Sequence, residues 1–242
     1  MKASGDDGLS PALRALWRRS DAPAARKQGL TVRRVVDAAV ELADAEGLTA
    51  VSMGRVADRL GFTPMALYRH VAGKDELLQL MFDGAVGEPP AVIDAASQAG
   101  WRSGLERWSR ELVAVLRRHP WALEIPIGGI PVTPNRLAWL DRGLRVQEET
   151  GLSEDGKAAT LLLLNGHVFW WARLEGDLGG EGRDDPGASG ALLSSLVDGE
   201  RFPALRRAID AGFLDDDIDD FAWGLERILD GVGQLIPRRS RT

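Results

Sequence analysis

The chain has 242 residues, a formal net charge of −6 at pH 7 and no cysteine. That length suffices for one large or two modest domains, and the lack of cysteine excludes disulfide frameworks, zinc–thiolate sites and thiol chemistry, which suits the reducing cytoplasm where we expect the protein. The N-terminus has no apolar signal peptide, and the longest apolar run, residues 161–174, is interrupted by polar side chains and too short to cross a bilayer, so no membrane partner is expected.

Charge is unevenly distributed along the chain. Residues 10–74 carry eleven Lys and Arg against six Asp and Glu, a net charge of +5, so the remainder carries −11. A basic N-terminal part joined to an acidic body is typical of a protein that binds phosphates at one end and repels them elsewhere.

The first 29 residues are rich in Ala, Gly and Arg. They predict a basic, partly disordered arm, residues 1–29, with one short helix near residues 13–18. Such an arm either reaches the DNA backbone or minor groove or is simply a solvated tail, and both interpretations stay open. Apolar residues at helical spacing then predict a helix that begins after Thr31 and ends at Gly47.

Residues 51–75 predict two short amphipathic helices separated by a turn at Gly61, which is the layout of a helix-turn-helix. Ser52 is a suitable N-cap for the first helix. Thr63 caps the second, and Pro64 takes its first position, where the missing N–H costs nothing. The second helix then presents a Tyr, an Arg and a His outward, which suits a polar, anionic partner.

A connecting helix is predicted over residues 77–88, and the Pro89–Pro90 pair ends it at a domain boundary. The body, residues 89–242, has no strand-like alternation and is predicted to be helical, except for a mobile loop over the Gly-rich residues 176–190. Its helices are expected at residues 101–118, 135–150, 157–175, 202–210 and 218–235.

The last helix carries an apolar seam, that is, apolar residues spaced alternately three and four apart. Gly224 and Gly231 beside it would let another helix approach closely, and the helix at residues 157–175 is apolar nearly all round. Together these features predict a four-helix interface of a homodimer, formed by Leu161, Val168, Ile218, Phe221, Leu225, Ile228 and Val232. Packing of the seam within one monomer has the same spacing, so that alternative stays open.

The stretch from Leu30 to Asp83 resembles the DNA-binding domain of the tetracycline-repressor (TetR) family of bacterial regulators. The matching features are Glu46-Gly47-Leu48, Leu60-Gly61, Leu67-Tyr68, His70-Val71 and Lys74-Asp75-Glu76-Leu77-Leu78. RRHPWALE and TPNRLAWLDRGL resemble, more loosely, the ligand-binding half of the tetracycline branch. The resemblance implies an all-α protein, with a three-helix helix-turn-helix DNA-binding domain over residues 30–76 and a C-terminal helical ligand-binding and dimerisation domain.

The family pattern also implies how double-stranded DNA is read. The second helix enters the major groove, and flanking groups hold phosphates. Arg55 follows Gly54, which stands where tetracycline repressors carry a base-reading Arg, so the operator should differ from theirs. A homodimer implies a palindromic operator. The DNA-contacting residues implied in this way are Arg55, Thr63, Pro64, Met65, Ala66, Tyr68, Arg69, His70 and Lys74.

A small-molecule effector among the body's helices is likewise implied by the resemblance. Eight Trp against one Tyr is unusual, and aromatic walls with a few polar groups suit an aromatic or amphipathic ligand. For any one Trp, a place in the core is the plainer interpretation. The candidate ligand-binding residues are Trp101, Trp108, His119, Trp121, Asn165, His167 and Trp170.

The leading hypothesis is a ligand-released, homodimeric transcriptional repressor. A constitutive DNA-binding dimer without an effector is the alternative, and sequence does not separate a repressor from an activator. An enzyme with a Trp/His pocket is the weaker third hypothesis, because three His, no Cys and no metal-spacing or nucleophile–base motif leave little chemistry. No metal or cofactor is expected.

Overall fold

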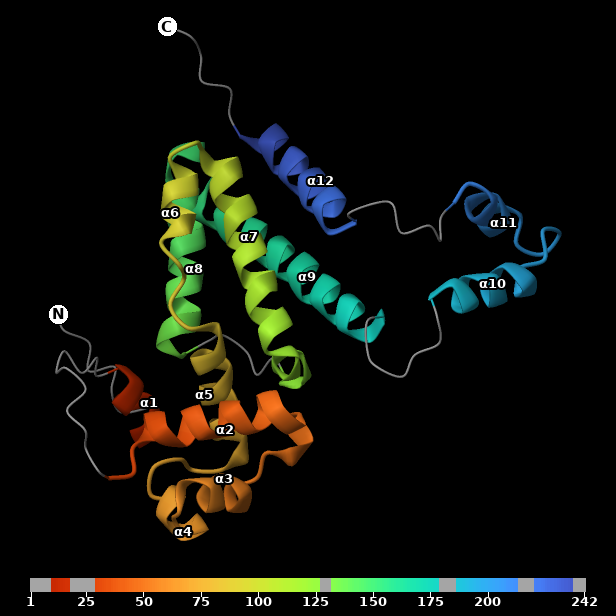
Figure 1. Cartoon of the computed structure of the whole chain (residues 1–242). Helices are drawn as coiled ribbons and strands as arrows, with labels where there is room; N and C mark the ends of the chain where they lie inside the picture. The colour runs from red at the N-terminus through yellow and green to blue at the C-terminus, as the bar shows by residue number, and fades with distance from the viewer. Residues whose placement is uncertain (1–9, 18–28, 127–131, 179–185, 213–219, 237–242) are drawn as a thin grey trace, which may run out of the picture.

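A computed structural model describes residues 10–17, 29–126, 132–178, 186–212 and 220–236. Over these residues the regular structure consists of α-helices and short 3₁₀ helices, without a strand, and no described helix is long and apolar enough to cross a membrane. The N-terminal helices gather at one end and α6 to α9 and α12 form a bundle at the other, with α5 running between them (Figure 1).

The head consists of the first five helices. They are α1 (Pro11–Trp17), α2 (Val32–Glu46), α3 (Met53–Leu60), α4 (Pro64–Leu67) and α5 (Lys74–Val86), with a 3₁₀ helix at Leu48–Ala50. The predicted caps are confirmed: the side-chain oxygens of Thr31, Ser52 and Thr63 each accept a hydrogen bond from the backbone N–H three residues later. Gly61 ends α3 with a φ of 73°, a left-handed conformation that favours glycine.

The predicted arm is in part an ordered helix. Ala12 of α1 is 1% exposed and belongs to the hydrophobic core, and α1 packs against α2. The Ser10 hydroxyl donates to the Glu76 carboxylate, and the Trp17 Nε1 donates to the Val132 carbonyl at 3.0 Å. Residues 1–9 and 18–28, with the rest of the predicted arm, lie outside the described residues.

The connecting helix begins and ends earlier than predicted. It is α5, which starts at Lys74 rather than residue 77 and ends at Val86 before Gly87, whose φ is 57°. Its C-terminal carbonyls are partnered by the body, because the Trp139 Nε1 lies 3.0 Å from the Gly87 carbonyl and 3.3 Å from that of Val86. The head and the body are therefore joined by hydrogen bonds as well as by the chain.

The body contains the remaining helices. They are α6 (Val92–Ser97), α7 (Trp101–Arg118), α8 (Pro134–Val146), α9 (Glu154–Leu178), α10 (Pro186–Leu196), α11 (Pro203–Asp210) and α12 (Asp220–Leu235), with 3₁₀ helices at Pro120–Glu124 and Glu148–Thr150. Helix α6 was not predicted. The predicted loop over residues 176–190 is wrong at both ends, since α9 continues to Leu178 and α10 starts at Pro186; residues 179–185 lie outside the described residues.

The N-terminus of α8 is held by a residue of α5 and not by its own side chains. Asn135, where the helix was expected to begin, lies inside the first turn, and its backbone N–H and that of Arg136 each donate to the Asp83 Oδ1 at 3.0 Å. Asp83 is 1% exposed, and burial raises the pKa of its carboxyl although the hydrogen bonds from these backbone N–H groups oppose the shift.

The apolar seam of α12 packs within the monomer, which is the second of the two arrangements that its spacing allowed. Phe221 stacks on His167 of α9 with ring centroids 5.0 Å apart, and a Cβ added at Gly224 would lie 2.5 Å from the His167 ring. Leu225 and Val232 are buried, and Ile228 is half-buried. Leu161 and Val168 of α9 are also buried, so these predicted interface residues face their own core; Ile218 lies outside the described residues.

Candidate DNA-binding surface and ligand cavity

The outer face of the helix-turn-helix presents an exposed set of polar and apolar side chains. Leu67 and Val71 are fully buried and fix α4 against the head, which turns Met65 and Tyr68 outward with exposed fractions of 68% and 49%. Thr63, Pro64, Arg69 and Lys74 are exposed as well, and Ala66 and His70 are half-buried. All eight predicted residues of this segment therefore lie together, around a helix of only four residues and the turn that follows it.

The basic side chains of this surface differ in how they are engaged. Arg55 is tied to α2's end, since its Nη2 donates to both carboxylate oxygens of Glu46 at 2.8 and 2.9 Å. Arg69 and Lys74 form no ion pair with another described residue. Arg69 and Lys74 are therefore available to phosphates or bases as far as the described residues go, whereas the Arg55 Nη2 is already engaged by Glu46.

A cavity of about 440 Å³ lies in the body between α5, α7, α8 and α9. Its walls are mainly apolar and aromatic, and the Trp108 and Trp139 rings meet edge to face with centroids 5.8 Å apart. Leu162 and Gly166 of α9 are exposed and line it as well, so the cavity meets the surface there. A largely apolar space of this size with few polar groups is the usual form of a small-molecule site.

Three lining side chains are polar: Gln79 of α5, Arg136 of α8 and Asn165 of α9. The Arg136 Nη1 donates to the Gln79 Oε1 at 3.1 Å, and its guanidinium carbon lies 4.9 Å from the centroid of the Phe82 ring. Burial lowers the pKa of Arg136, with Asp83 opposing the shift, yet an arginine in a protein keeps its charge. The cavity therefore contains a fixed positive charge on an aromatic wall.

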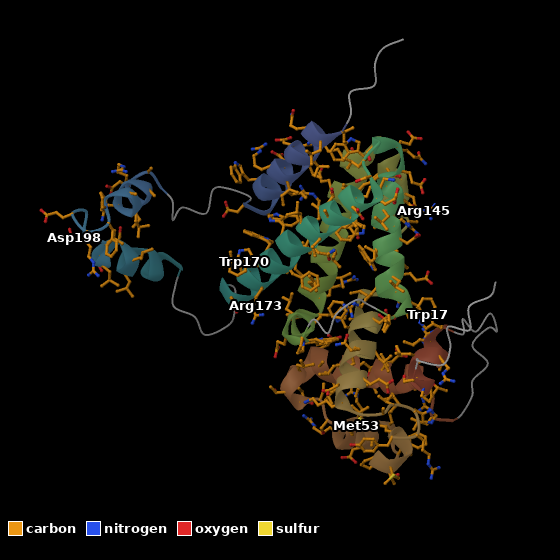
Figure 2. All side chains as sticks on the ribbon, turned by 180° about the vertical axis from the view of Figure 1, so that it is seen from behind. Trp17, Met53, Arg145, Trp170, Arg173 and Asp198 are labelled. Carbon is orange, nitrogen blue, oxygen red and sulfur yellow. The ribbon has the colours of Figure 1, made fainter. Side chains whose placement is uncertain are left out.

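Two of the seven predicted ligand-binding residues, Trp108 and Asn165, line this cavity. Trp101 instead lies against Gly233 of α12, and Trp170 is 66% exposed on the outer side of α9 (Figure 2). His167 stacks on Phe221 at the α9–α12 contact, and its Nε2 lies 2.9 Å from the Phe221 carbonyl oxygen.

The remaining two predicted residues lie at the contact between head and body. The His119 Nδ1 lies 2.8 Å from the Asp44 Oδ1, and the Trp121 Nε1 donates to the same oxygen at 2.6 Å. Asp44 belongs to α2, so both side chains fasten the end of α7 to the head. These five residues therefore do not share the cavity, although the sequence placed them in one pocket.

Sequence reasoning missed most of the cavity wall. The unpredicted polar and aromatic lining residues are Gln79, Phe82, Arg136, Trp139 and Phe169. Phe82 was interpreted only as part of the apolar stripe of the connecting helix, and no local pattern distinguishes a side chain that borders a gap from one that fills a core. Among the described residues no group of His, Asp and Glu could hold a metal ion.

These features match a known family of regulators along most of the chain. Residues 35–81 match the family model described as bacterial regulatory proteins, tetR family, and residues 95–236 match that of the tetracyclin repressor-like C-terminal domain. The chain belongs to the TetR family and is a DNA-binding transcriptional regulator.

Individual relatives agree with this assignment. The chain is 34% identical to the HTH-type transcriptional repressor DrrR1 of Streptomyces coeruleorubidus, over 98% of this chain and 90% of the relative. It is 29% identical to the class A tetracycline repressor protein from transposon 1721 of Escherichia coli, over 83% and 89% of the two chains. ActR of Streptomyces coelicolor, solved in complex with actinorhodin, superposes with a TM-score of 0.73 at 26% identity, over 87% of this chain and all of that one.

Proposed function

We propose that the protein is a homodimeric repressor that binds a palindromic operator and is released from it by a small molecule in the body cavity. One observation carries this proposal: a single helix serves both regions. Helix α5 begins at Lys74, beside the exposed face of α4, and contributes Gln79, Phe82 and Val86 to the cavity wall. A ligand that moves α5 therefore moves the DNA-reading surface, provided that it binds the two positions of α5 with different affinity.

Relatives support the regulatory part of the proposal. DrrR1 is a repressor, and ActR binds actinorhodin in its solved complex. The aromatic walls around Trp108, Trp139 and Phe169 suit a ring-bearing effector in this chain too. Such regulation takes place where the DNA is, so we place the protein in the cytoplasm.

The operator-binding residues in this proposal are the exposed residues around α4. Thr63, Pro64, Met65 and Ala66 meet base edges in the major groove, while Tyr68, His70 and Lys74 hold the backbone. Arg69 is assigned to a base because it is exposed and forms no ion pair with a described residue, whereas Arg55 is assigned to a phosphate after it leaves Glu46.

The dimer interface in this proposal is the outer face of α9 and α12 and not the buried seam. Leu163 and Trp170 of α9 are 60% and 66% exposed, and Trp223 of α12 is 58% exposed. The two helices lie along each other at one side of the body (Figure 1). An exposed apolar face of two neighbouring helices suits a four-helix contact with a second copy.

The first experiment is binding of the purified protein to the few hundred base pairs upstream of its own gene, measured over a salt series with random DNA as the control. We expect tight binding to a palindrome, with half-sites separated by about 34 Å or a multiple of it. Binding no better than that to random DNA would contradict an operator in this region. Loss of even non-specific, salt-sensitive binding would contradict the DNA-binding role itself.

Binding of variants to the operator then distinguishes the roles of Arg69 and Lys74. Arg69→Ala should weaken binding at one base position, by roughly 1–3 kcal/mol, and relax the specificity there. Lys74→Ala should weaken binding to all sequences and reduce the salt slope by about one. A uniform loss for Arg69→Ala would reassign Arg69 to a phosphate.

The interface is tested by the oligomeric state. Leu163→Glu should shift the protein from dimer to monomer in sedimentation equilibrium, because a charge would be buried in the apolar contact. Val92→Glu is the matched control, since Val92 is an exposed apolar residue on α6, outside the proposed interface, with an exposed fraction of 47%. A dimer that persists in Leu163→Glu would exclude this face as the interface.

A further inference from the structure

The cavity has one charged lining residue, and the charge is positive. Among its sixteen described lining residues, Arg136 is accompanied by two neutral amides, Gln79 and Asn165, and the others are apolar. Asp83, the carboxylate nearest to Arg136 in the chain's fold, does not line the cavity, because its Oδ1 is turned to the backbone N–H groups at the start of α8.

An amide and an aromatic ring, rather than a carboxylate, position the Arg136 guanidinium. No carboxylate oxygen of a described residue forms a salt bridge with its guanidinium, whose Nη1 donates instead to the Gln79 amide oxygen. The Phe82 ring below it supplies a cation–π contact, which orients the guanidinium but leaves its net charge unneutralised. A half-buried guanidinium has five N–H donors, so donors remain for a ligand.

The Gln79 amide also has an N–H donor left for a ligand. Its amide oxygen accepts from Arg136, and its Nε2 lies 3.5 Å from the Pro126 carbonyl, at the limit of a hydrogen bond. Because the amide nitrogen has two hydrogens, one is left to donate beside the guanidinium. Gln79 and Arg136 therefore present N–H donors side by side next to a full positive charge, which favours a ligand with an oxygen anion over a cation.

We infer that the cavity selects an aromatic ligand that carries an acidic oxygen, either a carboxylate or an ionised phenol, with Arg136 as its counter-ion and Gln79 as a neighbouring hydrogen-bond donor. The inference rests on the proposed function of this cavity as the effector site. The rings of the ligand lie between the aromatic walls, where Phe82 and Phe169 are stacked with centroids 6.2 Å apart. A cationic ring would instead bring a second positive charge to Arg136, with no lining carboxylate to offset it.

The test compares anthracene-9-carboxylate with anthracene-9-carboxamide, a neutral probe of nearly the same shape, by calorimetry and quenching of Trp fluorescence on the full-length wild-type protein. We expect the carboxylate to bind about tenfold tighter or more, the usual gain from a charge-assisted hydrogen bond in a partly buried site. This comparison needs no variant, so it does not depend on the folding of a mutant.

Variants then test whether Arg136 causes the preference for the carboxylate over the carboxamide. Arg136→Gln should bring the two probes to equal affinity. Arg136→Lys keeps the charge but loses the planar guanidinium that can bind a carboxylate through two N–H groups, so it should retain part of the preference. Arg145→Gln is the matched control, because Arg145 is exposed on the same helix and does not line the cavity (Figure 2). It should leave both affinities unchanged.

The outcomes separate the inference from the proposed function. Equal binding of both probes to the wild-type protein, lost in Phe169→Ala, would overturn the choice of an anion and leave the cavity as an effector site. A preference that survives in Arg136→Gln would overturn the assignment of the counter-ion. Binding of neither probe at millimolar concentration would overturn the inference for this cavity, whereas the operator experiment decides the DNA-binding function separately.

Discussion

The helices of the head and those of the body are stabilised by contacts that differ in sequence separation. In the head, Thr31, Ser52 and Thr63 each cap their own helix through a backbone N–H three residues away. In the body, the first turn of α8 is capped by Asp83, more than 50 residues earlier. The helix starts of the head are therefore set by their own neighbouring residues, whereas the start of α8 depends on which distant segment meets it.

The long-range contacts of the body form one connected set around the cavity. The Trp108 Nε1 donates to the Trp139 carbonyl at 3.0 Å, and the Trp139 Nε1 donates to the end of α5. Asp83, on that same helix, holds α8. Because α8 is bonded to α5 both through Asp83 and through Trp139, we expect a disturbance of the cavity wall to reach α5, whereas a change at a head cap should stay local.

The largest effect is expected at Trp108, which is 1% exposed. Trp108→Ala should lower the free energy of unfolding by about 3–5 kcal/mol, because it removes a large buried ring and leaves a void in the cavity wall. Denaturant unfolding followed by circular dichroism measures this. A loss of unfolding free energy below about 1 kcal/mol would mean that the cavity wall is not tightly packed. The long-range contacts of the body would then matter no more for stability than the local caps of the head.

A smaller but still large effect is expected at the long-range cap. Asp83→Ala leaves the N–H groups of Asn135 and Arg136 without their acceptor and should cost about 1–3 kcal/mol of unfolding free energy. Asp83→Asn keeps an acceptor oxygen and is the matched control. If the two variants were equally stable, the hydrogen bonds to α8 would not be what makes Asp83 important.

A local cap should matter less. Ser52→Ala removes the acceptor for the Arg55 N–H, an exposed hydrogen bond of 3.2 Å, and should cost about 1 kcal/mol. The effect should be confined to the head, so the affinity of the cavity for anthracene-9-carboxylate should not change. A change in that affinity equal to the one produced by Asp83→Ala would contradict the division between local and long-range contacts.

The smallest effect is the part of the pH dependence of stability that comes from Asp83. Burial raises its pKa, so the folded state holds this proton more tightly than the unfolded state does. The stabilisation that results from this tighter proton binding is fully present below the ordinary pKa of an aspartate, about 3.9. It is lost as the pH rises through the raised pKa of the folded state. Relative to Asp83→Asn, the wild-type protein should therefore lose stability as the pH rises above the ordinary aspartate pKa of about 3.9, measured by urea unfolding; an opposite slope would show that the hydrogen bonds outweigh burial.

The apolar seam shows how far a periodic pattern can be interpreted. The spacing of Phe221, Leu225 and Val232 correctly indicates one buried face of a helix, but it does not name the surface that buries it. In the structure, α9 of the same chain covers that face, with His167 beside Gly224. The apolar residues of α9 that stay exposed, such as Leu163 and Trp170, lie outside that contact.

The sequence by itself determined the helix-turn-helix, because Ser52, Gly61, Thr63 and Pro64 act within one turn of where they stand. It also determined the helical class of the body, because the period of apolar residues is a local property. The tertiary structure alone decided the cavity and its positive charge. Gln79 and Phe82 lie on α5 and Arg136 on α8, more than 50 residues later, and only packing brings the guanidinium to the amide and the ring.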